Sequence, residues 1–142
     1  MTIPQLSIFL ENRSGTLIKV LQQLKKANVQ LVATTIADTA EYGILRIVCA
    51  EPMRACEELK KAGIAVALSE VFALQLDNKP GSAADVIELF SIAGISITYI
   101  YTFLCGGKGI LVFRTDNTEL ARKTIEENKL PFISVEELTQ WQ

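Results

Sequence analysis

Two short segments of similar composition carry the residues best suited to binding a small charged molecule. The first reads Asn12-Arg13-Ser14-Gly15-Thr16-Leu17, and the second reads Asn78-Lys79-Pro80-Gly81-Ser82-Ala83. Each asparagine offers a hydrogen-bond donor and an acceptor, and Arg13 or Lys79 adds a positive charge. Each glycine permits a tight turn, and the helical pattern that follows would present free N–H groups to a carboxylate. The same residue types also make an ordinary turn and helix cap, so a purely structural role stays open.

The sequence lacks the side chain that most often acts as a general base. It contains no histidine, so it offers neither a Ser–His nor a Cys–His pair. The three cysteines, Cys49, Cys56 and Cys105, are too widely spaced for a CxxC metal site and odd in number for a disulfide set. The acidic pairs Glu57-Glu58 and Glu126-Glu127 fall on expected helices, where charged side chains usually face solvent. We therefore expect no enzyme activity, no bound metal and no cofactor.

Two further patterns are each compatible with a nucleotide or a nucleic acid as ligand. The run Gly106-Gly107-Lys108-Gly109 resembles part of a phosphate-binding loop, but such a loop joins a strand to a helix, and this run is expected to join two strands. Tyr99, Tyr101 and Phe103 alternate along one strand, as in a platform that stacks bases. A net charge of −2 provides no basic surface for nucleic acid. We expect a hairpin turn and packing aromatic rings, with no nucleic-acid partner.

An internal repeat organises the chain. When the sequence is shifted by 66 residues, Asn12 aligns with Asn78, Gly15 with Gly81 and Gly43 with Gly109, without a gap. The two copies predict two domains, residues 1–70 and 71–142, that share one fold. The composition, 49% hydrophobic and 21% charged, is rich in apolar residues for two small solvated domains. We therefore expect apolar surface to be buried between units, as in a homodimer.

Each copy shows the same order of predicted elements. In the first copy, an alternating strand over residues 6–10 comes before an apolar helical stripe over residues 17–24. A hairpin over residues 29–48, a helix over residues 52–62 and a strand over residues 65–68 follow. The second copy repeats this order and closes with a strand over residues 132–134. The predicted fold class is α+β, with two ferredoxin-like βαββαβ units, each a four-stranded antiparallel sheet with two helices on one face.

The order of elements and the turn motif together resemble the ACT domain, a regulatory module of amino-acid metabolism. That family combines a βαββαβ fold with an Asn-(Arg/Lys)-(Pro/Ser)-Gly-x-(Leu/Ala) turn after the first strand, and both copies match it over nearly the whole chain. Ligands of the family sit at an interface between two units, near this turn and the start of the second strand. The resemblance implies the following ligand-binding residues: Asn12, Arg13, Ser14, Gly15, Thr16, Leu17 and Gln30 in the first copy, and Asn78, Lys79, Pro80, Gly81, Ser82, Ala83 and Ser96 in the second.

The two copies differ at positions that the resemblance assigns to the ligand. Ser14 aligns with Pro80, and Gln30 aligns with the shorter Ser96. Leu10 and Leu76 occupy a place where some family members have a polar ligand contact. We therefore expect the two half-sites to bind unequally, and one of them can be structural only.

The sequence thus predicts a regulatory protein that binds a small molecule, an amino acid, at interfaces between domains or between the chains of a homodimer. Apolar neighbours such as Leu31 and Ile97 allow a small apolar side chain on the ligand. With no catalytic domain recognised, the protein would act on a separate enzyme. Two alternatives stay open: a structural dimerisation module with vestigial sites, and an acylphosphatase-like hydrolase that binds phosphate through Arg13. No apolar run is long enough for a membrane span and no secretion signal is recognised, so we expect a cytoplasmic protein without a membrane partner.

Overall fold

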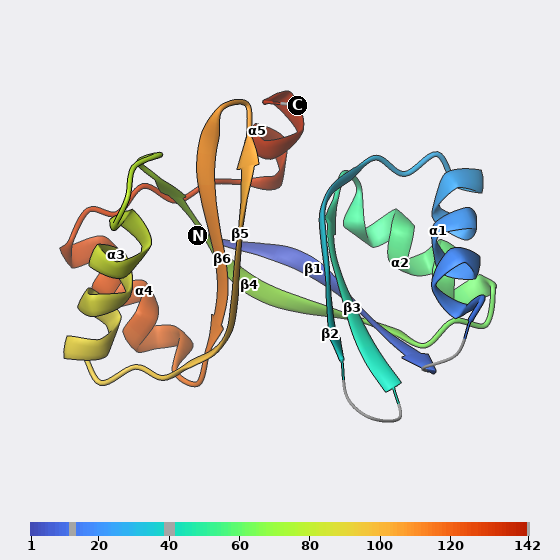
Figure 1. Cartoon of the computed structure of the whole chain (residues 1–142), viewed down its shortest axis with the longest axis horizontal. Helices are drawn as coiled ribbons and strands as arrows, with labels where there is room; N and C mark the ends of the chain where they lie inside the picture. The colour runs from blue at the N-terminus through green and yellow to red at the C-terminus, as the bar shows by residue number, and fades with distance from the viewer. Residues whose placement is uncertain (12–13, 39–41, 142) are drawn as a thin grey trace. The chain divides into compact units, whose positions relative to one another are not determined.

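The chain folds into two compact units, shown in Figure 1 as a computed structural model that describes residues 1–11, 14–38 and 42–141. The first unit consists of Pro4–Ser69, and the second unit consists of Met1–Ile3 together with the residues from Glu70 onward. The boundary falls inside two strands, β1 (Thr2–Glu11) and β4 (Val66–Leu76). Each of these strands therefore contributes residues to both units.

The first unit has the predicted order of strands and helices. Its strands run in the order β2-β3-β1-β4, where β3 pairs antiparallel with both β2 and β1. Helices α1 and α2 cover one face, because their apolar residues and those of β1 and β3 form one buried cluster. The bounds of its other elements are α1 (Thr16–Lys26), β2 (Leu31–Asp38), β3 (Tyr42–Cys49) and α2 (Pro52–Lys61). This arrangement confirms the ferredoxin-like fold class expected from the sequence.

Helix α1 is held by its apolar stripe and by a contact at its C-terminus. Val20 and Leu24, four residues apart, lie on the face turned to the sheet and are both buried. The guanidinium of Arg54 in α2 donates to the backbone carbonyls of Ala27 and Asn28, just beyond the end of α1. The same guanidinium pairs with Glu51 at 2.8 Å and lowers the pKa of that carboxyl. One side chain therefore connects the end of α1 to the start of α2.

The second unit repeats this plan and adds one helix. Its strands follow the order β4-β6-β5, and Figure 1 shows α3 and α4 together on one side of them. The core is built around Phe113, whose ring centroid lies 5.3 Å from that of Phe72 and 4.9 Å from that of Phe90. Asn117 is the N-cap of helix α4, and its Oδ1 accepts a hydrogen bond from the Leu120 N–H at 3.0 Å. The bounds of the elements are α3 (Ser82–Ile92), β5 (Ile97–Cys105), β6 (Lys108–Thr115), α4 (Thr118–Glu127) and α5 (Val135–Gln140).

The regular strand predicted over residues 132–134 is wrong. The segment runs beside β4, where the Gln75 N–H donates to the Pro131 carbonyl at 2.8 Å and the Ile133 N–H donates to the Ala73 carbonyl at 3.1 Å. Pairing stops after a single bridge at Phe132 because Ser134 is already the N-cap of α5. A strand needs more residues than this segment leaves free.

The glycine-rich run is the hairpin turn that the repeat predicted. Cys105 at the end of β5 pairs with Lys108 at the start of β6, and Gly106 and Gly107 between them have φ of +59° and +77°. Helix α5 packs against this turn: the Cys105 thiol donates to the Leu138 carbonyl at 3.4 Å, and the Lys108 ammonium lies 3.8 Å from the centroid of the Trp141 ring. A Cβ atom on Gly106 would lie 2.8 Å from both Cβ and the carbonyl oxygen of Trp141. Glycine is therefore required at position 106 by the approach of Trp141.

We predict that Gly106→Ala displaces the C-terminal helix, because the new methyl group collides with Trp141. Trp141 is the one tryptophan of the sequence, so its fluorescence reports the contact directly. We expect the emission of Gly106→Ala to shift to the red, as for a more solvated indole. Gly107→Ala is the matched control, because it shares the positive φ, with a cost of roughly 1–2 kcal/mol, but its Cβ would meet nothing within 4 Å. A Gly106→Ala spectrum identical to that of the wild type would contradict the contact.

Candidate functional site

The turn after β4 leads directly into an uncapped helix. β4 ends at Leu76, and α3 starts at Ser82 with Gly81 as its N-cap at φ +87°. No side chain makes a capping hydrogen bond at this helix start, and the Ser82 N–H donates to the Lys79 carbonyl at 3.4 Å. A Cβ atom on Gly81 would meet nothing within 4 Å, so the space beside the turn is open. Gly15 takes the same place before α1, with φ +91°.

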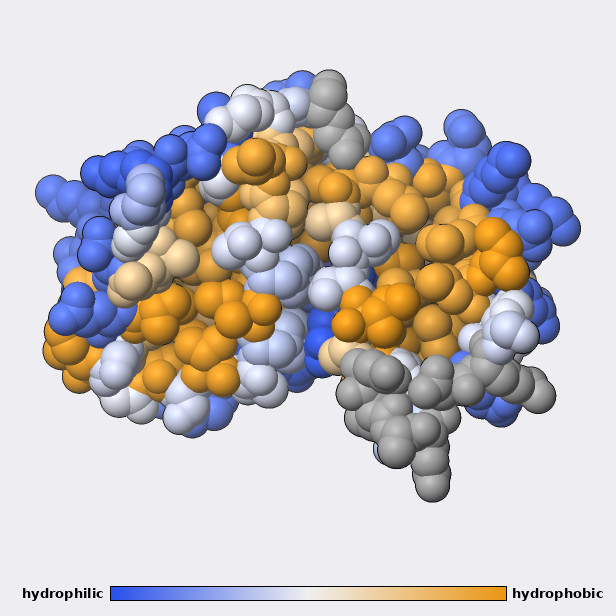
Figure 2. All heavy atoms as spheres, viewed as in Figure 1, coloured by the Kyte–Doolittle hydropathy of each residue, from blue (hydrophilic) through white to orange (hydrophobic). Residues whose placement is uncertain are grey.

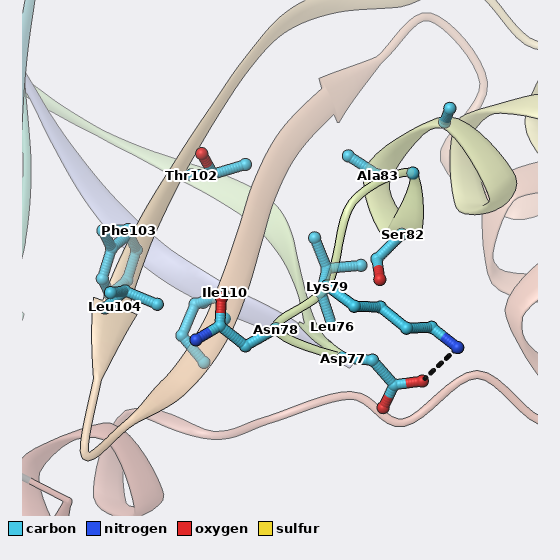
Figure 3. Close-up of a pocket in the computed structure, with 13 residues that line it drawn as sticks. Leu76, Asp77, Asn78, Lys79, Ser82, Ala83, Thr102, Phe103, Leu104 and Ile110 are labelled. Carbon is cyan, nitrogen blue, oxygen red and sulfur yellow. Dashed lines mark ion pairs between the residues drawn. The ribbon is translucent and has the colours of Figure 1, made fainter.

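A cavity of about 580 Å³ lies against this turn in the second unit (Figure 3). Its volume is within the range of small-molecule sites, and most of its lining is apolar. One wall comes from the turn and the start of α3, and the other comes from the ends of β5 and β6 that face the hairpin turn. The lining residues are Leu76, Asp77, Asn78, Lys79, Gly81, Ser82, Ala83, Ala84, Thr102, Phe103, Leu104, Gly109 and Ile110.

The strand pairing explains why the hairpin forms a wall of this cavity. Gly109 of β6 is paired with Leu76 at the end of β4 on one side and with Leu104 at the end of β5 on the other. The hairpin and the turn after β4 therefore lie at the same edge of the sheet. The predicted ligand-binding residues did not include the five lining residues from β5 and β6, nor Leu76, Asp77 and Ala84. The antiparallel order of the predicted fold was the signal that could have found the strand residues.

The two polar residues of the turn point in different directions. Figure 3 shows the Asn78 amide directed toward Ile110 and the strands, that is, toward the cavity wall. The Lys79 ammonium instead turns to the Asp77 carboxylate, at 3.9 Å. Both members of this pair are largely exposed, so it holds neither residue firmly. Asn78 is thus the polar side chain of the turn that faces the opposite wall.

Ser82 carries an unsatisfied hydroxyl. Its Oγ is buried and has no hydrogen-bond partner, and it is the one such side-chain atom found in the described ranges. In Figure 3 this oxygen is directed toward the Lys79 side chain. Beyond it lies a smaller hollow of about 220 Å³, which Ser82 also lines, together with Gln75, Asp85 and Pro131. Leaving a buried hydroxyl without a partner costs about 1–3 kcal/mol, which a bound polar group can recover.

The structure does not bring the two strand-start residues to the turns of their own units. Gln30 lines a separate cavity of about 390 Å³ at the far end of α1, beside Lys25 and Asn28. Ser96 precedes β5, whereas the cavity meets β5 at Thr102–Leu104, so roughly 20 Å of extended chain separates them. Both backbone groups of Ser96 are bonded to Asp116, at 3.1 and 3.3 Å. A site that combines a turn with a strand start therefore needs a second unit or a second copy.

The remaining residues implied for the first copy are only partly described. Asn12 and Arg13 lie outside the described residues. Ser14 and Gly15 are exposed just before α1, and Leu17 is 36% exposed on its first turn. The hydroxyl of Thr16 donates to the Glu11 carbonyl at 2.9 Å. In the second copy, Pro80 belongs to the turn but does not line the cavity.

The thiols are poorly suited to nucleophilic chemistry. Burial raises the pKa of the Cys49 thiol to about 11, and burial also raises that of Cys105. Both therefore stay protonated near neutral pH, and the thiol is a much weaker nucleophile than the thiolate. The described ranges contain no group of three or more His, Cys, Asp and Glu residues placed to hold a metal ion. They also contain no helix long and apolar enough to cross a membrane.

Comparison with known families gives a match to the ACT domain pair over residues 1–141. The chain belongs to the ACT domain pair family. Its duplicated turn and its two ferredoxin-like units are therefore those of a tandem ACT protein. Comparison with curated proteins gave no match.

Solved structures share the fold of this chain. A protein from Bacteroides thetaiotaomicron is 36% identical, with a TM-score of 0.91, over 97% of this chain and 96% of that one. The regulatory subunit of aspartate kinase from Thermus thermophilus, in a ligand-free form, is 15% identical, with a TM-score of 0.61, over 87% of this chain and 91% of that one. The regulatory subunit of aspartate kinase from Thermus flavus is 16% identical, with a TM-score of 0.58, over 87% and 90%. At these identities, the two Thermus structures show a shared fold.

We predict that Gly81→Ala destabilises the ACT pair by roughly 1–2 kcal/mol, because a residue with a Cβ atom is strained in the left-handed conformation. Urea unfolding measures the change in the free energy of unfolding. Gly81→Asn is the matched control and should cost less, because asparagine tolerates this conformation better. If both variants unfolded at the wild-type urea concentration, the turn would not need a left-handed residue at this position.

Proposed function

We propose that this ACT domain pair is a regulatory protein that binds an amino acid at the turn between β4 and α3. One observation carries the proposal: the turn forms a wall of a cavity into which Asn78 is directed and which an uncapped helix start borders. The family match supports a regulatory role, because ACT domains are regulatory modules.

The lining suits the two charges of an amino acid. The ligand carboxylate would accept hydrogen bonds from the first N–H groups of α3, where the open space at Gly81 lets it approach the backbone. The ligand ammonium would lie near the Asn78 amide oxygen, because the Asn78 side chain is directed at the cavity wall. Lys79 is turned away from this wall, so it is not needed as a direct partner.

The rest of the lining favours a small apolar side chain on the ligand. Ala83 and Ala84 leave room at the helix start, and Phe103 and Leu104 give an apolar surface opposite. Burial of such a side chain is worth about 25 cal/mol for each Å² removed from water. A small aliphatic amino acid therefore fits this cavity better than a charged one.

We further propose that a second copy of the chain covers the open side of the site. In the second unit, Ile92, Ile100 and Leu104 are 77%, 43% and 66% exposed. Figure 2 shows apolar side chains gathered over α3 and β5, and β5 is the last strand in the sheet order. A homodimer would bury this surface, and a second copy could supply the strand-start residues Gln30 or Ser96.

The regulated partner would be a separate enzyme. The solved structures of similar fold include regulatory subunits of aspartate kinase, which supports an enzyme partner as a general kind of target. The site we propose needs no membrane or nucleic acid, and a cytoplasmic location fits an amino-acid sensor. We favour binding over the structural alternative because Asn78 is directed at the cavity wall and not at its own backbone. The acylphosphatase-like alternative depends on Arg13, which lies outside the described residues.

Thermal melts of the full chain with each of the twenty protein amino acids at millimolar concentration test the proposal. An amino acid at a hundredfold excess over its Kd stabilises the folded state by about 2.7 kcal/mol, which raises Tm by roughly 5–10 °C. We expect the largest shift with a small aliphatic amino acid. Asn78→Ala should abolish the shift, whereas Lys79→Ala should keep it. Wild-type melts that no amino acid moves would leave the structural module as the better account.

A further inference from the structure

We propose that the two turns of the repeat are not equivalent and that the turn of the second unit alone holds a ligand. This inference rests on the proposed function, since it says which of the two motif copies performs it. Equivalent residues of the two copies lie 66 positions apart. Three differences between the copies support the second turn as the ligand site.

The first difference is the hydroxyl at the start of the helix. In the first unit, Thr16 Oγ1 donates to the Glu11 carbonyl at 2.9 Å, so the hydroxyl ties the helix start to the end of β1. In the second unit, the equivalent carbonyl, that of Asp77, accepts the Lys79 N–H at 2.9 Å. The Ser82 hydroxyl is left buried and without a partner. The Thr16 hydroxyl of the first unit thus has a hydrogen-bond partner within the protein, whereas the Ser82 hydroxyl of the second unit is available to a ligand.

The second difference is the freedom of that side chain. Threonine is β-branched, so its χ1 is restricted in a helix, and the bond to Glu11 fixes it further. Serine has one heavy atom on Cβ, and its hydroxyl can reach different partners in its staggered rotamers. Ser82 can therefore turn from its present direction toward a polar group in the cavity that it lines.

The third difference is the space at the helix start. Ala83 and Ala84 line the cavity of the second unit, and their equivalents in the first unit are Leu17 and Ile18. Those two side chains are 36% and 54% exposed on the first turn of α1. Each has three more carbon atoms than alanine. The helix start of the second unit therefore carries small side chains, and that of the first unit carries bulky apolar ones.

The two copies therefore have separate roles. The first turn, in which Thr16 bonds to the end of β1, has a structural role. Its exposed Leu17 and Ile18 do not contact a ligand. The second turn keeps an unsatisfied hydroxyl and small side chains. The expected stoichiometry is one ligand per chain.

Calorimetric titration of the full chain tests this assignment, with L-valine, L-leucine and L-isoleucine as probes and with any other protein amino acid that raises Tm. We expect one site per chain. Ser82→Ala should weaken binding about tenfold, the loss expected for one hydrogen bond to a charged group. Ala83→Leu, which copies the first unit, should abolish the binding heat. The matched variants Thr16→Ala and Leu17→Ala should keep Kd within about twofold of the wild type.

Melts without added amino acid show whether the variants fold and supply a second comparison. Ser82→Ala should keep the wild-type Tm or raise it, because it removes an unsatisfied hydroxyl, whereas Thr16→Ala should lower Tm. Two sites per chain, or equal weakening by Thr16→Ala and Ser82→Ala, would overturn the assignment. If the wild type bound none of the amino acids, the proposed function itself would fail, and that result is distinct from binding at both turns.

Discussion

The antiparallel pairing of β4 with β6 is the contact on which the candidate site depends. It places Gly109 opposite Leu76, so the turn into α3 and the β5–β6 hairpin share one edge of the sheet. A Cβ atom on Gly109 would lie 3.3 Å from the Leu76 carbonyl, which is closer than most residues tolerate. The absence of a side chain at this point lets the two strands end close together. The cavity between turn and hairpin follows from that approach.

Much of the fold could be predicted because its local signals agree with its tertiary contacts. Val20 and Leu24 keep helical spacing and are buried, and Gly106-Gly107 forms the turn that the repeat required. The error at residues 132–134 came from weighing the repeat above a local signal. Ser134 and Glu137 form a capping box, a pattern that marks the start of a helix and was readable in the sequence. The repeat correctly predicted the elements that the two copies share, such as the hairpin turn, and gave a wrong prediction at residues 132–134, where the copies differ.

The strand residues that line the site were harder to predict than the turn residues. The turn residues form a motif because one short segment must supply a left-handed glycine, an asparagine and a helix start together. Thr102, Leu104 and Ile110 reach the cavity only through strand pairing, and nothing in their local sequence marks them. The different hydrogen bonding of Ser82 and Thr16 could not be predicted from sequence either, since both are hydroxyl residues at a helix start. Their hydrogen bonds, one made and one missing, are tertiary facts.

A sensor needs a ligand whose contacts differ between two states of the protein, because a ligand that binds both states equally shifts nothing. The hairpin of the second unit is suited to such a difference. Leu104 and Gly109 line the cavity, and the residues between them hold α5 through the Cys105 thiol, the close approach at Gly106 and the Lys108 ammonium. A shift of the hairpin toward a ligand would therefore alter the contacts of Trp141 with Gly106 and Lys108. Since these contacts are close, a movement of the hairpin would change how the C-terminal helix is held.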